Sequence, residues 1–110
     1  MESGRNHRDA CLSGQRPSED ILRVIRKETP TSLKIVYNRF LRREPKLGGK
    51  VTAKFYIKKD GSVALVLPME DTTDEPQFAN AILTEVFNWR FAASGCNGYD
   101  IVAVPFTFAP

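Results

Sequence analysis

The stretch from Gly49 to Phe91 limits the possible folds more than any other part of the chain. It begins with a run in which apolar and polar residues alternate, the period of two that is typical of a strand with one buried and one wet face. The apolar residues of the run are Val51, Ala53, Phe55 and Ile57, and the residues between them are Thr52, Lys54, Tyr56 and Lys58. The sequence therefore predicts a half-exposed antiparallel strand.

Asp60-Gly61 follows this run and predicts a tight turn into a second strand that carries Val63, Leu65 and Leu67. A two-residue loop would pair polar residues of one strand with apolar residues of the other, so that neither face of the hairpin would be apolar throughout. A three-residue loop, Lys59 to Gly61 with Gly61 left-handed, places the apolar residues of both strands on one face. The predicted cross-strand pairs are Ile57 with Val63, Phe55 with Leu65, and Ala53 with Leu67.

Amphipathic stretches on both sides of the hairpin predict helices that cover its apolar face. In the first, the apolar positions follow the helical spacing and the stretch ends near Pro45. They are Leu33, Val36, Tyr37, Phe40 and Leu41. In the second, Thr73 or Asp74 is the expected cap and Pro76 fits the first turn. Its stripe is Phe78, Ile82, Val86 and Trp89.

A shorter helical run is expected upstream of Pro30. It starts at Ser18, and its apolar residues are Ile21, Leu22, Val24 and Ile25. The residues from Met1 to Pro17 carry almost nothing apolar, so we expect a disordered leader or a cloning remnant there.

The last predicted strand runs from Tyr99 to Phe108. Val102, Val104, Phe106 and Phe108 alternate inward, while Ile101, Ala103, Pro105 and Thr107 alternate outward. Because Pro105 has no N–H to donate, the strand belongs at an edge, with its missing donor turned away from its neighbour.

These elements predict one α+β domain over residues 18–110, with residues 1–17 outside it. The expected architecture is a two-layer sandwich, in which two main helices pack on one face of an antiparallel sheet of about three strands. No run of 18 apolar residues occurs, so we expect the chain as given to be soluble and not to span a membrane.

Charge is distributed unevenly along the chain. Residues 17–61 hold 12 Lys and Arg against 5 Asp and Glu, whereas residues 62–110 hold 1 against 6. The basic half suggests a patch for an anionic partner such as nucleic acid or lipid headgroups, although solvated helix and sheet faces explain the same charges. The residues of this candidate basic patch are Arg39, Arg42, Arg43, Lys46, Lys50, Lys54 and Lys58.

Reactive side chains are few, and none forms a convincing catalytic, metal or cofactor site. His7, the one histidine, lies near Cys11 in the expected leader, where no fixed geometry can support a Cys-His nucleophile. Two cysteines and one histidine cannot complete a four-ligand zinc site. A disulfide between Cys11 and Cys96 stays open, but the sequence favours a free or incidental thiol, because nothing in it holds the leader near the Cys96 loop. We expect no enzymatic activity and no cofactor.

A further pattern emerges from the order and spacing of residues across the chain from Ile21 to Pro110. The residues that carry it are Tyr37, Leu41, Pro45, Leu47, Gly49, Lys50, Val51, Phe55, Ile57, Asp60, Gly61, Val63, Trp89, Arg90, Phe91, Pro105, Phe106 and Phe108. In these the chain resembles the C-terminal domains of TonB-like energy transducers, and more narrowly the AgmX/PglI C-terminal type. It departs from the narrower type at Val36 and Ala81, where members often carry cysteines.

The resemblance implies a non-enzymatic, periplasmic protein-binding domain whose parent protein has an inner-membrane anchor. Such domains take part in energy transduction, transport or motility, and bind an extended segment of an outer-membrane or envelope partner by β-augmentation, that is, strand addition at a sheet edge. The expected binding edge is the last strand, with Ile101, Ala103, Pro105 and Thr107 outermost and Arg90 nearby to hold acidic flanking residues. Pro105 leaves an alternative open, in which this edge is protected against pairing and partners dock elsewhere. Trp89 and Phe91 are expected to be core anchors.

Two other functions remain open on the sequence alone. A generic α+β adaptor or dimerisation domain without energy transduction would explain the same fold, and homodimerisation is compatible with it. A nucleic-acid-binding module that uses the basic half would show strongly salt-dependent binding.

Overall fold

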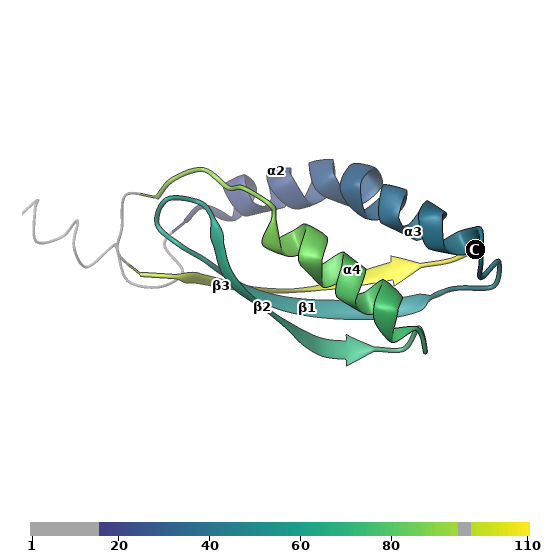
Figure 1. The fold of residues 1–110 in the computed structure, drawn as a ribbon. Coiled ribbons are helices and arrows are strands. Elements are labelled where there is room, and N and C mark those ends of the chain that lie inside the picture. The colour runs from purple at the N-terminus through teal and green to yellow at the C-terminus, as the bar shows by residue number, and fades with distance from the viewer. Residues whose placement is uncertain (1–15, 95–97) are drawn as a thin grey trace, which may run out of the picture.

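Two layers form the computed structural model, which describes residues 16–94 and 98–110. One layer is an antiparallel sheet in the order β2-β1-β3, and the helices cover one face of it (Figure 1). The elements are α2 (Ser18–Glu28), η1 (Thr29–Leu33), α3 (Lys34–Leu41), β1 (Gly49–Ile57), β2 (Val63–Asp71), α4 (Pro76–Phe87) and β3 (Asp100–Phe108). The predicted α+β architecture is confirmed. Within the described residues no helix is both long and apolar enough to cross a membrane.

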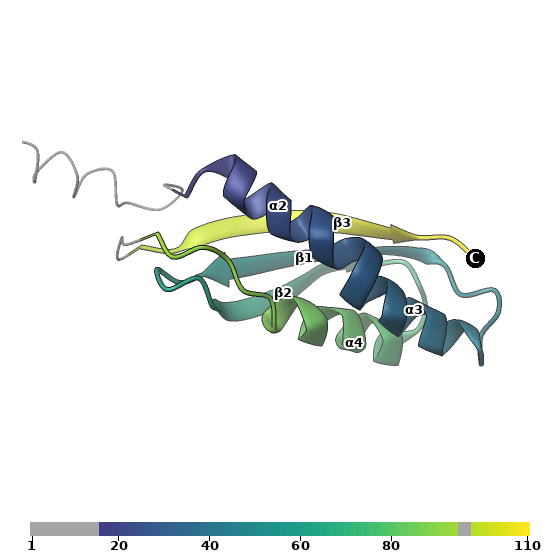
Figure 2. The same cartoon turned by 90° about the horizontal axis from the view of Figure 1, so that it is seen from above.

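The core lies between β1 and the helices. The predicted inward residues of β1 are all fully buried: Val51, Ala53, Phe55 and Ile57. Above them lie Leu33 of η1 and Phe78, Ile82 and Val86 of α4, which are also fully buried. Burial of each large apolar side chain stabilises the fold by about 1.5–3 kcal/mol, so β1 and α4 together supply much of the stability. Viewed from above the helices, α4 runs along the β2 side of the sheet (Figure 2).

Pro30 does not separate two helices as the sequence suggested. The chain stays helical from Ser18 to Leu41, and Pro30 lies in η1, a single π-helical turn between α2 and α3. Proline lacks an N–H and its ring clashes with the carbonyl four residues earlier, and a wider turn relieves both problems. The hydroxyl of Thr31 donates to the carbonyl oxygen of Lys27 at 2.8 Å, which gives that carbonyl a partner.

The hairpin loop has the predicted length and conformation. Lys58 N–H donates to the Ser62 carbonyl at 2.8 Å, and Gly61, whose φ is 94°, donates to the Lys58 carbonyl at 2.9 Å. The Asp60 carboxylate accepts hydrogen bonds from the Ser62 hydroxyl at 2.7 Å and the Ser62 N–H at 2.9 Å. These bonds hold the pKa of Asp60 below its ordinary value. Their contribution is therefore present above the unfolded-state pKa and is lost as the pH falls through the folded one.

Register along the hairpin differs from the prediction beyond the first pair. Ile57 pairs with Val63 as expected, but β2 then has an extra residue, Ala64, and Phe55 pairs with Val66 rather than Leu65. Ala53 likewise pairs with Pro68 rather than Leu67. A bulge is tolerated on an edge strand because the unpaired backbone groups can meet water. The one-residue shift turns the side chains of Leu65 and Leu67 to the outer face of the sheet.

The start of α4 also differs from the prediction. Its N-cap residue is Glu75, and neither Thr73 nor Asp74 caps the helix with its side chain. Asp74 instead has a φ of 58°, and the Thr73 hydroxyl accepts the N–H of Glu75 at 3.3 Å, one residue before the helix. The chain thus turns sharply at Asp74, which moves the expected cap residues away from the exposed helical N–H groups.

Arg16 belongs to the folded domain, although the sequence placed it in the leader. Its side chain is 1% exposed and forms an ion pair with Asp100 at the start of β3. The same guanidinium donates to the carbonyl oxygens of Ala92 at 2.9 Å and Lys58 at 3.1 Å. Arg16 therefore joins the segment before α2 to the hairpin end and to β3.

We predict that Tyr37→Phe lowers the free energy of unfolding by about 1–2 kcal/mol. The buried Tyr37 hydroxyl donates to the Leu47 carbonyl at 2.6 Å, and burial raises the pKa of this hydroxyl. Without the hydroxyl the Leu47 carbonyl loses this partner. Urea unfolding measures the loss, and Tyr99→Phe at an exposed position is the matched control. Equal midpoints for both variants would contradict the prediction.

Candidate functional site at the sheet edges

The hydrogen bonds of β1 reveal which backbone groups are open at each edge of the sheet. Lys50 and Lys58 both bond toward β2, since Lys50 exchanges bonds with Thr72 and Lys58 donates to Ser62. Backbone direction alternates along a strand, so even-numbered β1 residues face β2 and odd-numbered ones face β3. Thr52, which pairs with Pro105, therefore faces away from it.

It follows that the nitrogen of Pro105, which carries no hydrogen to donate, points to the open edge of β3. The residues two positions apart share this direction, so Ile101, Ala103 and Thr107 present both N–H and C=O there, while Pro105 presents only C=O. All four side chains are exposed, on the face opposite the helices. The predicted edge position of β3 and its outward residues are confirmed.

Arg90 does not lie where the resemblance suggested. It forms an isolated bridge with Ser62, directly before β2, and so lies at the opposite side of the sheet from β3. Its guanidinium donates to the carbonyl oxygens of Asn88 at 3.2 Å and Trp89 at 3.0 Å. The reason is that the chain leaves α4 beside β2 and crosses the hairpin end only afterwards. Arg90 cannot hold a segment bound to the β3 edge.

Trp89 and Phe91 on either side of Arg90 are buried, 3% and 7% exposed. The Trp89 ring meets the Phe55 and Phe106 rings edge to face, at centroid distances of 6.2 and 5.9 Å. Both residues are core anchors, as the sequence analysis expected.

The candidate basic patch is divided between the two layers. Its arginines and Lys46 lie on α3 and the loop after it, whereas Lys50, Lys54 and Lys58 extend along β1 on the face opposite the helices. Lys50 forms an ion pair with Glu70 at 3.1 Å, and the Lys54 ammonium lies 5.8 Å from the Tyr56 ring centre. The sequence grouped residues that the fold places on opposite faces, so they do not form one anion-binding surface.

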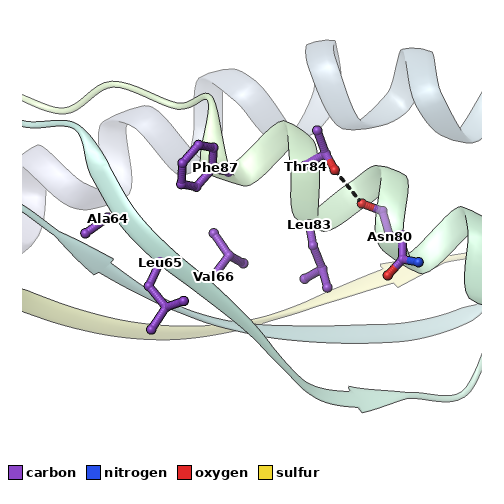
Figure 3. A pocket seen from close by; sticks show the side chains of 7 residues that line it. All are labelled: Ala64, Leu65, Val66, Asn80, Leu83, Thr84 and Phe87. Atoms are coloured by element: carbon purple, nitrogen blue, oxygen red, sulfur yellow. Dashed lines mark hydrogen bonds between the residues drawn. The ribbon is translucent and has the colours of Figure 1, made fainter.

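A groove between β2 and α4 is the feature that the sequence did not reveal. Its volume is about 340 Å³, and its walls are mostly apolar (Figure 3). The lining residues are Ala64, Leu65, Val66, Asn80, Leu83, Thr84 and Phe87. The one signal in the sequence was Phe87, an aromatic residue off the buried stripe of the helix, which is 46% exposed. The register shift that places Leu65 at the groove left no recognisable sequence signal.

Reactive chemistry is sparse in residues 16–94 and 98–110, where no three metal-binding side chains come together. His7, Cys11 and Cys96 lie outside the described residues. Comparisons with protein-family models, curated proteins and solved structures gave no match. The arrangement therefore offers two hydrogen-bonding edges and an apolar groove as the features through which another molecule can be bound.

Proposed function

We propose that this chain is a non-enzymatic protein-binding domain that holds an extended segment of a partner protein at the β3 edge. The observation that carries the proposal is that β3 has one neighbour, β1, and an open side with alternating donors and acceptors. Backbone bonds to a single added strand supply affinity in this mode, and exposed side chains beside the edge supply selectivity.

The biological setting that we propose is a TonB-like energy transducer or a related motility or transport complex. The domain then works in the periplasm, on a parent protein with an inner-membrane anchor, and its partner is an outer-membrane or envelope protein. The support is the residue pattern from Tyr37 to Phe108 together with the α+β fold. The narrower AgmX/PglI resemblance belongs to the same proposal.

Pro105 divides the β3 edge into two unequal parts. Ile101 and Ala103 offer complete donor and acceptor sets on one side of it, and Thr107 offers one on the other. A proline at an edge also discourages unwanted pairing. We therefore expect a partner strand to bond mainly along Ile101 and Ala103 and to contribute fewer bonds beyond Pro105.

An NMR titration with an eight-residue peptide of alternating Val and Thr tests the proposal. We expect the largest amide shifts at Ile101, Ala103 and Thr107, whose N–H groups would become hydrogen-bonded. N-methylation of every second peptide residue gives the matched control, because one methylated set blocks the bonds and the other set leaves them free. Shifts confined to Lys54 and Tyr56 would assign binding to the outer face of β1 instead, and equal effects of both methylated sets would argue against strand addition.

A further inference from the structure

By ordinary dimensions, a layer of two packed helices is wider than a sheet of three strands. Three strands at a spacing of about 4.8 Å span roughly 14 Å, whereas two packed helices of about 10 Å each span roughly 20 Å. On the β2 side α4 packs against β2, and Leu83 and Phe87 line the space beside the strand (Figure 3). One more strand beside β2 would bring the sheet to about 19 Å and match the two layers.

The open edge of β2 offers backbone hydrogen-bonding groups to such a strand. Phe55 and Ala53 bond toward β3, so their partners Val66 and Pro68 direct their backbone groups away from β1, to the open edge. Val66 offers both N–H and C=O there, and Pro68 offers C=O alone. The added strand would therefore bond to Val66, which lines the groove.

Apolar side chains flank this edge on both faces. Leu65 and Leu67 are 46% and 37% exposed on the outer face, as a result of the bulge at Ala64. Phe87, which is 46% exposed, and the partly buried Leu83 lie on the helix side. A strand bound here would cover apolar surface with both of its faces, unlike a strand that has one side in water.

Opposite charges mark the two ends of the edge. Asp71 ends β2, next to Glu70, whose carboxylate already pairs with Lys50, and Arg90 lies beside Ser62 just before β2 begins. Antiparallel pairing is the more stable arrangement per residue, and it places the first residue of an added strand near Asp71 and the last near Arg90. Charge complementarity thus predicts Lys or Arg at the start of the strand and Asp or Glu at its end.

We propose that the groove between β2 and α4 binds an extended segment of another protein as a fourth strand, antiparallel to β2. The segment has an apolar run of about five residues, matching Ala64 to Pro68, with basic residues before it and acidic residues after it. This site is separate from the β3 edge and does not depend on binding there.

A second copy of the chain fits this edge poorly. Direct pairing of two β2 strands would place the two α4 helices about 5 Å apart if each stays above its strand, whereas packed helices need 8–10 Å. A single strand without its own helix has no such conflict. We therefore assign the groove to a strand of a partner rather than to self-association.

The test uses the peptide acetyl-Lys-Lys-Val-Ile-Val-Thr-Val-Glu-Glu-amide, followed by amide shifts on the full chain. We expect shifts at Val66, Leu83 and Phe87, and at least tenfold weaker binding of a peptide with the Lys and Glu pairs exchanged. Equal binding of both peptides would overturn the assigned direction. Shifts confined to β3 would overturn the site but would support the proposed function.

Two variants at exposed apolar positions complete the experiment. Phe87→Asp is expected to weaken binding of the first peptide at least tenfold, because it places a charge in the groove. Ile35→Asp on α3, 61% exposed and away from both sheet edges, is the matched control and should leave this binding unchanged. Similar losses in both variants would overturn the proposal, and so would absence of any shift. Shifts at Val66 that follow protein concentration without peptide would assign the groove to a second copy instead.

Discussion

Arg16→Ala is expected to lower the free energy of unfolding by about 3–5 kcal/mol, the largest effect of any charge removal in the described residues. The substitution leaves the carboxylate of Asp100 buried without its cation, since the side chains of this pair are 1% and 9% exposed. It also removes the donors that reach the carbonyl oxygens of Ala92 and Lys58. Urea or thermal unfolding measures the loss.

The matched control is Arg23→Ala, which removes an ion pair with Asp20 whose arginine side chain is 69% exposed. A loss below about 1 kcal/mol is expected there, because solvent screens exposed pairs. In a double-mutant cycle, Arg16→Ala combined with Asp100→Ala should cost less than the sum of the two single losses. Additive losses would show that the pair is not coupled.

Gly61→Ala is expected to cost about 3–5 kcal/mol, from backbone strain together with steric overlap. The φ of Gly61 is 94°, a conformation that residues with a Cβ rarely adopt. An added Cβ would also overlap the carbonyl oxygen of Phe91, whose N–H donates to the Gly61 carbonyl at 2.8 Å. The residue is held by the hairpin on one side and by the segment after α4 on the other.

Gly61→Asn separates the two causes, because asparagine tolerates positive φ better than alanine but has the same Cβ. We expect both variants to lose similar stability in thermal unfolding, since the overlap with Phe91 remains. A nearly wild-type melting temperature for Gly61→Asn would show that strain alone matters.

Both open edges of the sheet carry one proline with its nitrogen directed outward, Pro105 in β3 and Pro68 in β2. Each proline removes one donor from a row that would otherwise pair with any extended chain, and so lowers the risk of aggregation. Residues that offer both an N–H and a C=O to the open edge remain beside each proline. They are Ile101 and Ala103 in β3 and Val66 in β2. Selective binding of short segments is compatible with this arrangement, whereas long uninterrupted pairing is not.

Three features could be predicted from the sequence: the alternation of buried and exposed side chains along β1, the left-handed backbone conformation of Gly61, and the edge position of β3. Each depends on a local rule: side chains alternate along a strand, glycine tolerates positive φ, and proline cannot donate. The elements expected from these rules are present, and the α+β class follows from them. Those features were determined by neighbouring residues alone.

The register of β2, the position of Arg90 and the burial of Arg16 were decided only by the tertiary structure. The bulge at Ala64 moved Leu65 and Leu67 to the outer face, and no turn residue or break in the apolar pattern of β2 announces it. Arg90 and Arg16 take their places through contacts with segments distant in the chain, at Ser62 and Asp100 respectively. Local patterns carry no information on which distant segments meet, so the groove beside β2 became visible only when the two layers were assembled.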